Sequence, residues 1–117
     1  MSKTVRSPAV DELCDAVLLL RSREECYSFF QDLCTVSELI SLGQRFEVAK
    51  MLTEEKTYLD IARRTGASTA TISRVNRALE YGSDGYRMIF DRIKETAADQ
   101  DSEKRPDKRE LRIRAVK

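Results

Sequence analysis

Apolar residues recur every three to four positions along most of this chain, a spacing that gathers side chains on one face of an α-helix. In the N-terminal third, the spacing predicts one helix over residues 8–20, a second that begins after Ser22, and a third from Thr35 to Leu52. Ser22 and Thr35 are each followed three residues later by a glutamate, which is the capping-box signature of a helix N-terminus. No segment alternates apolar and polar residues for long enough to form a sheet. The pattern predicts an all-α fold.

The C-terminal half predicts three more helices. Thr57 has a hydroxyl that can cap a short fourth helix, which ends before Gly66. A fifth helix follows over residues 68–81 and ends at the glycine after it. A sixth begins after Ser83 or Asp84. The sequence therefore predicts about six helices.

Several of these helices have an apolar face that a folded core should cover. The faces of the second, third and sixth helices are Cys26, Phe29, Phe30 and Leu33; Leu39, Leu42, Phe46, Ala49, Met51 and Leu52; and Tyr86, Ile89, Phe90, Ile93 and Ala97. The three cysteines fall on apolar helical faces, and unpaired cysteine is commonly buried. We therefore expect Cys14, Cys26 and Cys34 to be small core residues.

The composition fits a single domain of 117 residues with one strongly solvated segment. Charged residues make up 35% of the chain, above the usual quarter. The last segment, residues 98–117, has seven basic and five acidic residues and few apolar ones. We expect it to be a disordered charged tail, in which residues 108–114 are the part most able to form a short helix.

Composition also argues against several classes of function. The chain has no histidine, and its three cysteines lack CxxC spacing, so it can form neither a Cys/His zinc site nor a histidine-dependent catalytic triad. No carboxylate lies in a recognisable catalytic frame, and no glycine-rich phosphate loop is present. We expect neither enzymatic activity nor a metal or cofactor.

The chain also lacks the marks of a membrane or exported protein. No apolar run approaches the roughly 18 residues that a membrane helix needs. The first residues, MSKTVRSPAVDELCD, do not follow the basic-then-apolar plan of a signal peptide. We expect a soluble, cytoplasmic protein.

The fourth and fifth helices have the residues that a helix-turn-helix requires. Ala62 is small enough for two helices to cross closely, and Gly66 tolerates the positive φ of a tight turn. Ile72 then supplies a branched apolar side chain directed back at the first helix, with Val75 and Leu79 continuing inward. An ordinary αα-hairpin can show the same spacing. The outward-facing residues must therefore decide between such a hairpin and a DNA-binding helix-turn-helix.

The outward face of the fifth helix begins with short side chains that fit a DNA major groove roughly 12 Å wide. The residues that we expect to contact DNA are Lys56, Arg63, Arg64, Ser68, Thr69, Ala70, Thr71, Ser73, Arg74 and Arg77. Thr69, Ala70 and Ser73 would read base edges, and the lysine with the arginines other than Arg74 would contact phosphates. Between residues 56 and 77, five basic residues against one acidic residue give +4, compared with +1 for the whole chain. Such concentrated positive charge is typical of DNA binding.

The alternative is a helical protein-interaction module, in which the helix-turn-helix contacts another protein and the tail steers association. Protein interfaces usually lose charge and gain aromatic residues at their centres. Here Tyr58 and Tyr81 are the only aromatic residues near the motif. The charge cluster therefore favours DNA as the partner.

The runs LISLGQRFEVAKML and KTYLDIARRTGASTATISRVNRALEYGSDGY resemble the Trp repressor superfamily, and most closely its TrpR-related YerC/YecD branch. The resemblance extends from about Val10 to Ala97. It implies six helices whose N-terminal members interlock with a second copy, so that a homodimer presents two helix-turn-helix units to a two-fold-symmetric operator. Half-sites would then lie about one DNA turn, ~34 Å, apart.

For this chain the resemblance implies a DNA-binding domain over residues 1–97, with the helix-turn-helix at about 57–81 and the tail outside it. The expected function is that of a bacterial transcriptional regulator, a repressor by analogy, which lies in the cytoplasm and on the nucleoid when bound to DNA.

In the tryptophan-sensing members, the ligand's ring lies between two arginines, and threonines help to hold its polar ends. The matching positions here are Thr35, Arg45, Thr71 and Arg74. Two positions depart from those repressors, because Val75 replaces a glycine and Ala78 replaces a serine. A branched side chain fills space beside the ring, and the lost hydroxyl removes a hydrogen-bond partner. The comparison disfavours tryptophan and leaves a co-repressor of unknown identity, or none.

Overall fold

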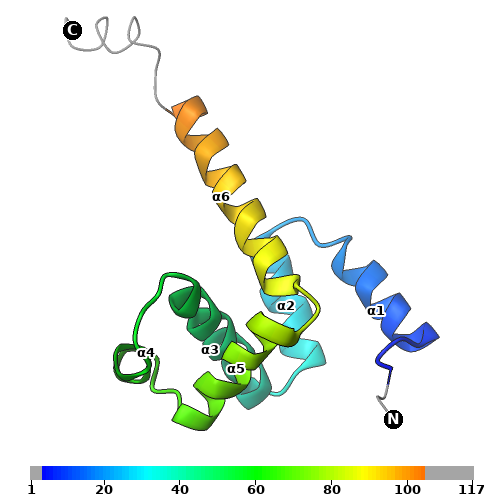
Figure 1. The fold of residues 1–117 in the computed structure, drawn as a ribbon. Helices are drawn as coiled ribbons and strands as arrows, with labels where there is room; N and C mark the ends of the chain where they lie inside the picture. Colours follow the sequence, from blue (N-terminus) through cyan, green and yellow to red (C-terminus); the bar gives the residue numbers. More distant parts are fainter. Residues whose placement is uncertain (1–3, 105–117) are drawn as a thin grey trace, which may run out of the picture. The chain divides into compact units, whose positions relative to one another are not determined.

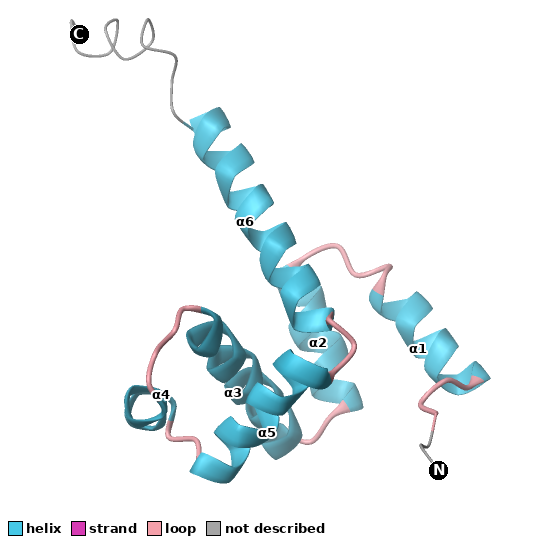
Figure 2. Cartoon of the chain, viewed as in Figure 1, coloured by secondary structure: helices cyan, strands magenta, loops and turns pink. Residues whose placement is uncertain are grey.

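The computed structural model describes residues 4–104, which form six α-helices and no strand (Figures 1 and 2). The helices are α1 (Pro8–Val17), α2 (Arg23–Leu33), α3 (Val36–Thr53), α4 (Tyr58–Thr65), α5 (Thr69–Tyr81) and α6 (Gly85–Lys104). The predicted all-α fold is confirmed. Among the described helices, none is both long and apolar enough to cross a membrane.

The helices α2, α3, α4 and α5 begin where the sequence predicted because short hydroxyl side chains cap them. The Ser22 hydroxyl accepts from the Glu25 N–H at 3.1 Å, and the Thr57 hydroxyl accepts from the Asp60 N–H at the same distance. α1 is shorter than predicted and ends at Val17 instead of residue 20. After it, the chain tightens into i→i−3 hydrogen bonds, in which the N–H groups of two successive leucines donate to Ala16 and Val17.

The chain divides into two compact units, Met1–Gly43 and Gln44–Lys117, with the division inside α3. The division follows from where apolar side chains are covered. α1 and α2 contain no buried residue, whereas the nine buried hydrophobic residues of the described part of the chain all lie in the second unit.

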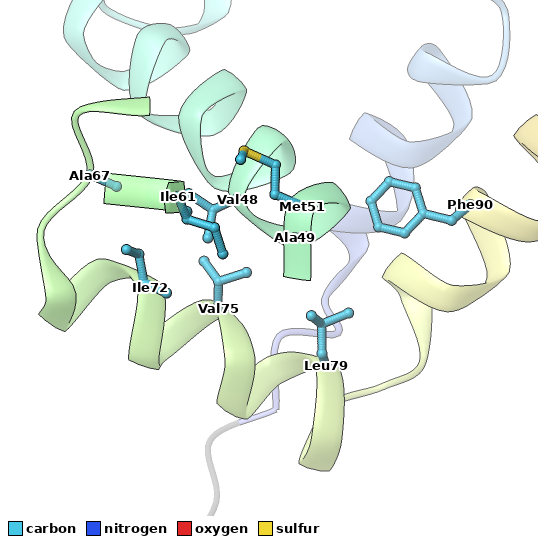
Figure 3. Packing of buried hydrophobic residues seen from close by; sticks show 9 residues of the cluster. All are labelled: Val48, Ala49, Met51, Ile61, Ala67, Ile72, Val75, Leu79 and Phe90. Atoms are coloured by element: carbon cyan, nitrogen blue, oxygen red, sulfur yellow. The ribbon is translucent and has the colours of Figure 1, made fainter. Parts of the chain in front are cut away.

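The core of the second unit joins α3, α4, α5 and α6 (Figure 3). Its members are Val48, Ala49, Met51, Ile61, Ala67, Ile72, Val75, Leu79 and Phe90. Ile61 and Ile72 are fully buried, and each such side chain contributes about 1.5–3 kcal/mol relative to exposure. Since α4 is only eight residues long, this core, rather than helix propensity, keeps it folded.

Several predicted core residues are not covered within one chain. Leu33, Leu42, Ile89 and Ile93 are exposed on α2, α3 and α6, and Phe46 is 40% exposed. The prediction for the cysteines was also wrong, because Cys14 is exposed and Cys26 and Cys34 are half-buried. Helical periodicity identifies the apolar face of a helix but does not say whether the same chain covers it.

α6 continues past the point where the apolar pattern stops. We predicted a charged tail from residue 98, but the helix runs to Lys104. Residues 98–104 contain no glycine or proline, the residues that most strongly end a helix. The rest of the predicted tail, with the predicted short helix at 108–114, lies outside the described residues.

Candidate nucleic-acid interface

α4 and α5 form a helix-turn-helix whose turn is fixed by its own hydrogen bonds. Gly66 has φ of 73°, as the sequence predicted, and its N–H donates to the Ala62 carbonyl at 2.9 Å. The Thr65 hydroxyl donates to the Ile61 carbonyl at 2.7 Å and accepts from the Ala67 N–H at 3.1 Å. These hydrogen bonds stabilise the turn that leads into α5.

α5 has one buried and one exposed face, as predicted. Ile72, Val75 and Leu79 are buried against α3 and α4, as the labelled side chains show (Figure 3). Thr69, Ala70, Ser73, Arg74 and Arg77 are all exposed on the same helix. The exposed face of α5 therefore has short side chains in its first turn and arginines in the turns that follow.

Two of the residues expected to contact DNA are engaged in capping. The Ser68 hydroxyl accepts from the Thr71 N–H at 3.1 Å and lies 3.1 Å from the Thr71 hydroxyl. Thr71 is half-buried. These two hydroxyls fix the N-terminus of α5, so the exposed hydroxyls of Thr69 and Ser73 are better placed to reach a base edge.

The basic residues flank this turn on both sides in the sequence. Arg63 and Arg64 are exposed in the last turn of α4, where the helix dipole favours positive charge. Lys56 is half-buried, and its backbone N–H donates to the Met51 carbonyl at 3.1 Å. Arg63 and Arg64 on α4, together with Arg74 and Arg77 on α5, make the exposed surface of the motif positively charged.

The residues of the expected ligand pocket do not come from one unit. Thr35 belongs to the first unit, where it lines a cavity of about 340 Å³ with six residues: Tyr27, Gln31, Cys34, Val36, Leu39 and Ile40. Arg45, Thr71 and Arg74 belong to the second unit, and both arginines are exposed. Val75, which replaces a glycine of the tryptophan-sensing repressors, is only 3% exposed and packs in the core.

Thr35 also forms the predicted capping box with Glu38. The Thr35 N–H donates to the Glu38 carboxylate at 2.8 Å, and the Glu38 N–H donates to the Thr35 hydroxyl at 3.1 Å. The bond from the Thr35 backbone, assisted by its side chain, lowers the pKa of Glu38 from its ordinary value of 4.5. Thr35 therefore has a structural role at the start of α3.

Sequence reasoning missed two polar side chains that contact this motif. The Gln44 amide of α3 donates to the Thr65 carbonyl at 3.1 Å, and Arg87 Nε of α6 donates to the Leu79 carbonyl at 3.2 Å. Neither residue belongs to an apolar stripe or a capping signature, so the sequence carried no signal for these long-range contacts.

Two short helices joined by a glycine turn, within an all-helical core, define a helix-turn-helix protein. The model of the Trp repressor protein family matches residues 8–94. The chain belongs to this family. It is 54% identical over 98 residues to the uncharacterized protein YerC of Bacillus subtilis (strain 168). The aligned region covers 84% of this chain and 94% of YerC.

The fold is also similar to a solved structure of the same kind. The TrpR-like protein from Eubacterium eligens ATCC 27750 superimposes with a TM-score of 0.75 and 59% sequence identity. The match covers 77% of this chain and 93% of that chain. Both the family assignment and the fold that the sequence predicted are therefore confirmed.

Proposed function

We propose that this protein is a sequence-specific DNA-binding transcriptional regulator that reads DNA with α5. The observation that carries the proposal is the division of α5 into a fully packed face and an exposed face of small polar residues and arginines. Thr69, Ala70 and Ser73 are short enough to let the helix enter the major groove. Membership of the Trp repressor protein family supports the same reading.

Electrostatics supports a nucleic-acid partner over a protein partner. Arg63, Arg64, Arg74 and Arg77 are exposed around the turn. Arginines of this kind contact phosphates and fix the register of a protein on DNA, whereas base edges are read by the helix between them. The exposed aromatic residues near the motif are Tyr58 and Tyr81, fewer than the centre of a protein interface usually has.

The active form is a homodimer joined through the first unit. Residues 4–43 have no buried side chain, yet they expose large apolar residues such as Leu18 at 81% and Val36 at 76%. A segment this short and uncovered gains too little apolar burial to offset its ordering entropy alone. A second copy offers the same apolar faces in return, which gives an isologous interface. Sedimentation equilibrium should give twice the 13.4 kDa chain mass.

A small-molecule co-repressor, if one acts, is not tryptophan. Val75 occupies space in the core at the position where the tryptophan-sensing repressors carry glycine, and Ala78 supplies no hydroxyl. Added tryptophan should leave DNA affinity unchanged.

Selection of bound duplexes from a random library, with and without amino acids, tests these proposals together. We expect a two-fold-symmetric sequence with half-sites about one DNA turn apart. A dimeric preparation that binds no duplex at low salt would contradict the proposal and favour a protein-interaction module. A sequence selected only in the presence of tryptophan would contradict the statement about the ligand.

A further inference from the structure

The second helix of the motif, α5, has a hydrogen bond from a neighbouring helix just before it and another near its C-terminal end. At the turn, the Gln44 side chain of α3 donates to the carbonyl of Thr65, the last residue of α4. Near the end of α5, Arg87 Nε of α6 donates to the carbonyl of Leu79. The four residues lie in the second unit. We call these two contacts the tethers.

The tethers are not needed to form the helices that they contact. Both acceptor carbonyls are among the last four of a helix, which have no intrahelical partner. The turn is already fixed internally by the Thr65 hydroxyl and the Gly66 N–H. What the tethers add is a directional link between the motif and the helices on either side of it.

Apolar packing alone does not supply this direction. The buried stripe of α5, Ile72, Val75 and Leu79, gains free energy from removal of area from water, which is non-directional. A helix held only by such a stripe is oriented by the shape of its packing alone. Two hydrogen bonds, one before the first turn of α5 and one near its last turn, oppose a change in that orientation because hydrogen bonds weaken steeply with angle.

We propose that Gln44 and Arg87 are positioning residues, which hold α5 in the orientation that reads base edges. This inference rests on the proposed DNA-binding function. Base recognition needs side chains held to within about 0.5 Å, whereas contacts from long arginines to phosphates tolerate displacement. Loss of a tether therefore lowers the fraction of molecules in the reading orientation, and the affinity for the specific site falls by that fraction.

The test uses Gln44→Met and Arg87→Met in the full chain, because methionine keeps the length of the side chain and removes the donor. Gln100→Met and Arg92→Met are matched controls on the exposed surface of α6. Anisotropy titrations over a range of salt compare the selected duplex with a scrambled duplex of equal length. Circular dichroism confirms that each variant is folded at the assay temperature.

We expect each tether variant to bind the selected duplex about tenfold more weakly, the size of one net hydrogen bond with its acceptor left unpaired. Binding to the scrambled duplex and the salt dependence should match those of the corresponding control. Arg87→Lys should restore part of the loss, because an ammonium group can donate to the same carbonyl. Gln44→Asn, whose amide is one methylene shorter, should show the same selective loss as Gln44→Met.

Equal loss on both duplexes, or no loss on either, would overturn the inference. A salt slope that falls with Arg87→Met but not with Arg92→Met would also overturn it, because Arg87 would then be a phosphate contact. A wild-type chain that binds the two duplexes equally would instead refute the proposed function, and the inference with it. The wild-type titration therefore separates the two failures.

Discussion

The centroid of the Phe46 ring on α3 lies 5.1 Å from the centroid of the Phe90 ring on α6, and the two ring planes are tilted by 42°. Tilted pairs at this distance are favourable beyond the area that they bury. Phe90 is 8% exposed and is the one member of the buried core that α6 contributes within the described residues. This pair is therefore a principal link between α6 and the rest of the second unit.

Replacing Phe90 should destabilise the protein more than replacing Phe46. Phe90→Ala removes a nearly buried ring and should lower the free energy of unfolding by about 3 kcal/mol. Phe46→Ala should cost less, because that ring is 40% exposed in one chain. Denaturant unfolding at one fixed protein concentration measures both. A larger loss for Phe46→Ala would indicate that a second copy covers Phe46.

The turn between α3 and α4 contains a residue that glycine should improve. Glu55 has φ of 62°, a left-handed conformation that costs a residue with a side chain about 1 kcal/mol more than glycine. Glu55→Gly should therefore raise the free energy of unfolding by about 0.5–1 kcal/mol. Gly66→Ala, at φ of 73°, should lower it by a similar amount. The two shifts in denaturation midpoint should have opposite signs, and a loss of stability in Glu55→Gly would be inconsistent with this conformation.

Glu38 should make the start of α3 sensitive to acid. Its pKa is lowered in the folded state by the bond from the Thr35 backbone, so its contribution is present above the unfolded value of 4.5 and is lost as the pH falls through the folded value. Glu38→Gln keeps an acceptor for the capping box but has no carboxylate to titrate. Below pH 4.5 the variant should lose less stability than the wild type, as measured by thermal melts from pH 6 to pH 3. Identical acid dependence in both proteins would count against a role for the Glu38 charge.

Local structure was largely predictable from the sequence because it depends on residues close together. The hydroxyls of Ser22 and Thr57 cap the helices that follow them, and Gly66 takes the positive φ that its turn requires. The inward direction of Ile72 and Val75 follows from helical spacing. Each of these features is determined within three or four residues.

Features that depend on distant residues were not predictable. The exposed apolar faces of α2 and α6 look the same in the sequence whether the same chain or a second copy covers them. The tethers join Gln44 to Thr65 and Arg87 to Leu79. Both acceptors are backbone carbonyls, which every residue has, so the residue type does not indicate the contact. The hydrogen bond between the Ser68 and Thr71 hydroxyls at the start of α5 was likewise not predicted.

The central claim is that α5 reads DNA, and the most direct test is a salt titration of duplex binding by α5 variants. Arg77→Ala should weaken binding to every duplex and lower the salt slope by about one ion for each helix-turn-helix, whereas the control Arg92→Ala should not. Thr69→Ala and Ser73→Ala should instead change which base is preferred, at about 1–3 kcal/mol for each position affected. If all three α5 variants bind the selected and scrambled duplexes as the wild type does, α5 is not the recognition helix.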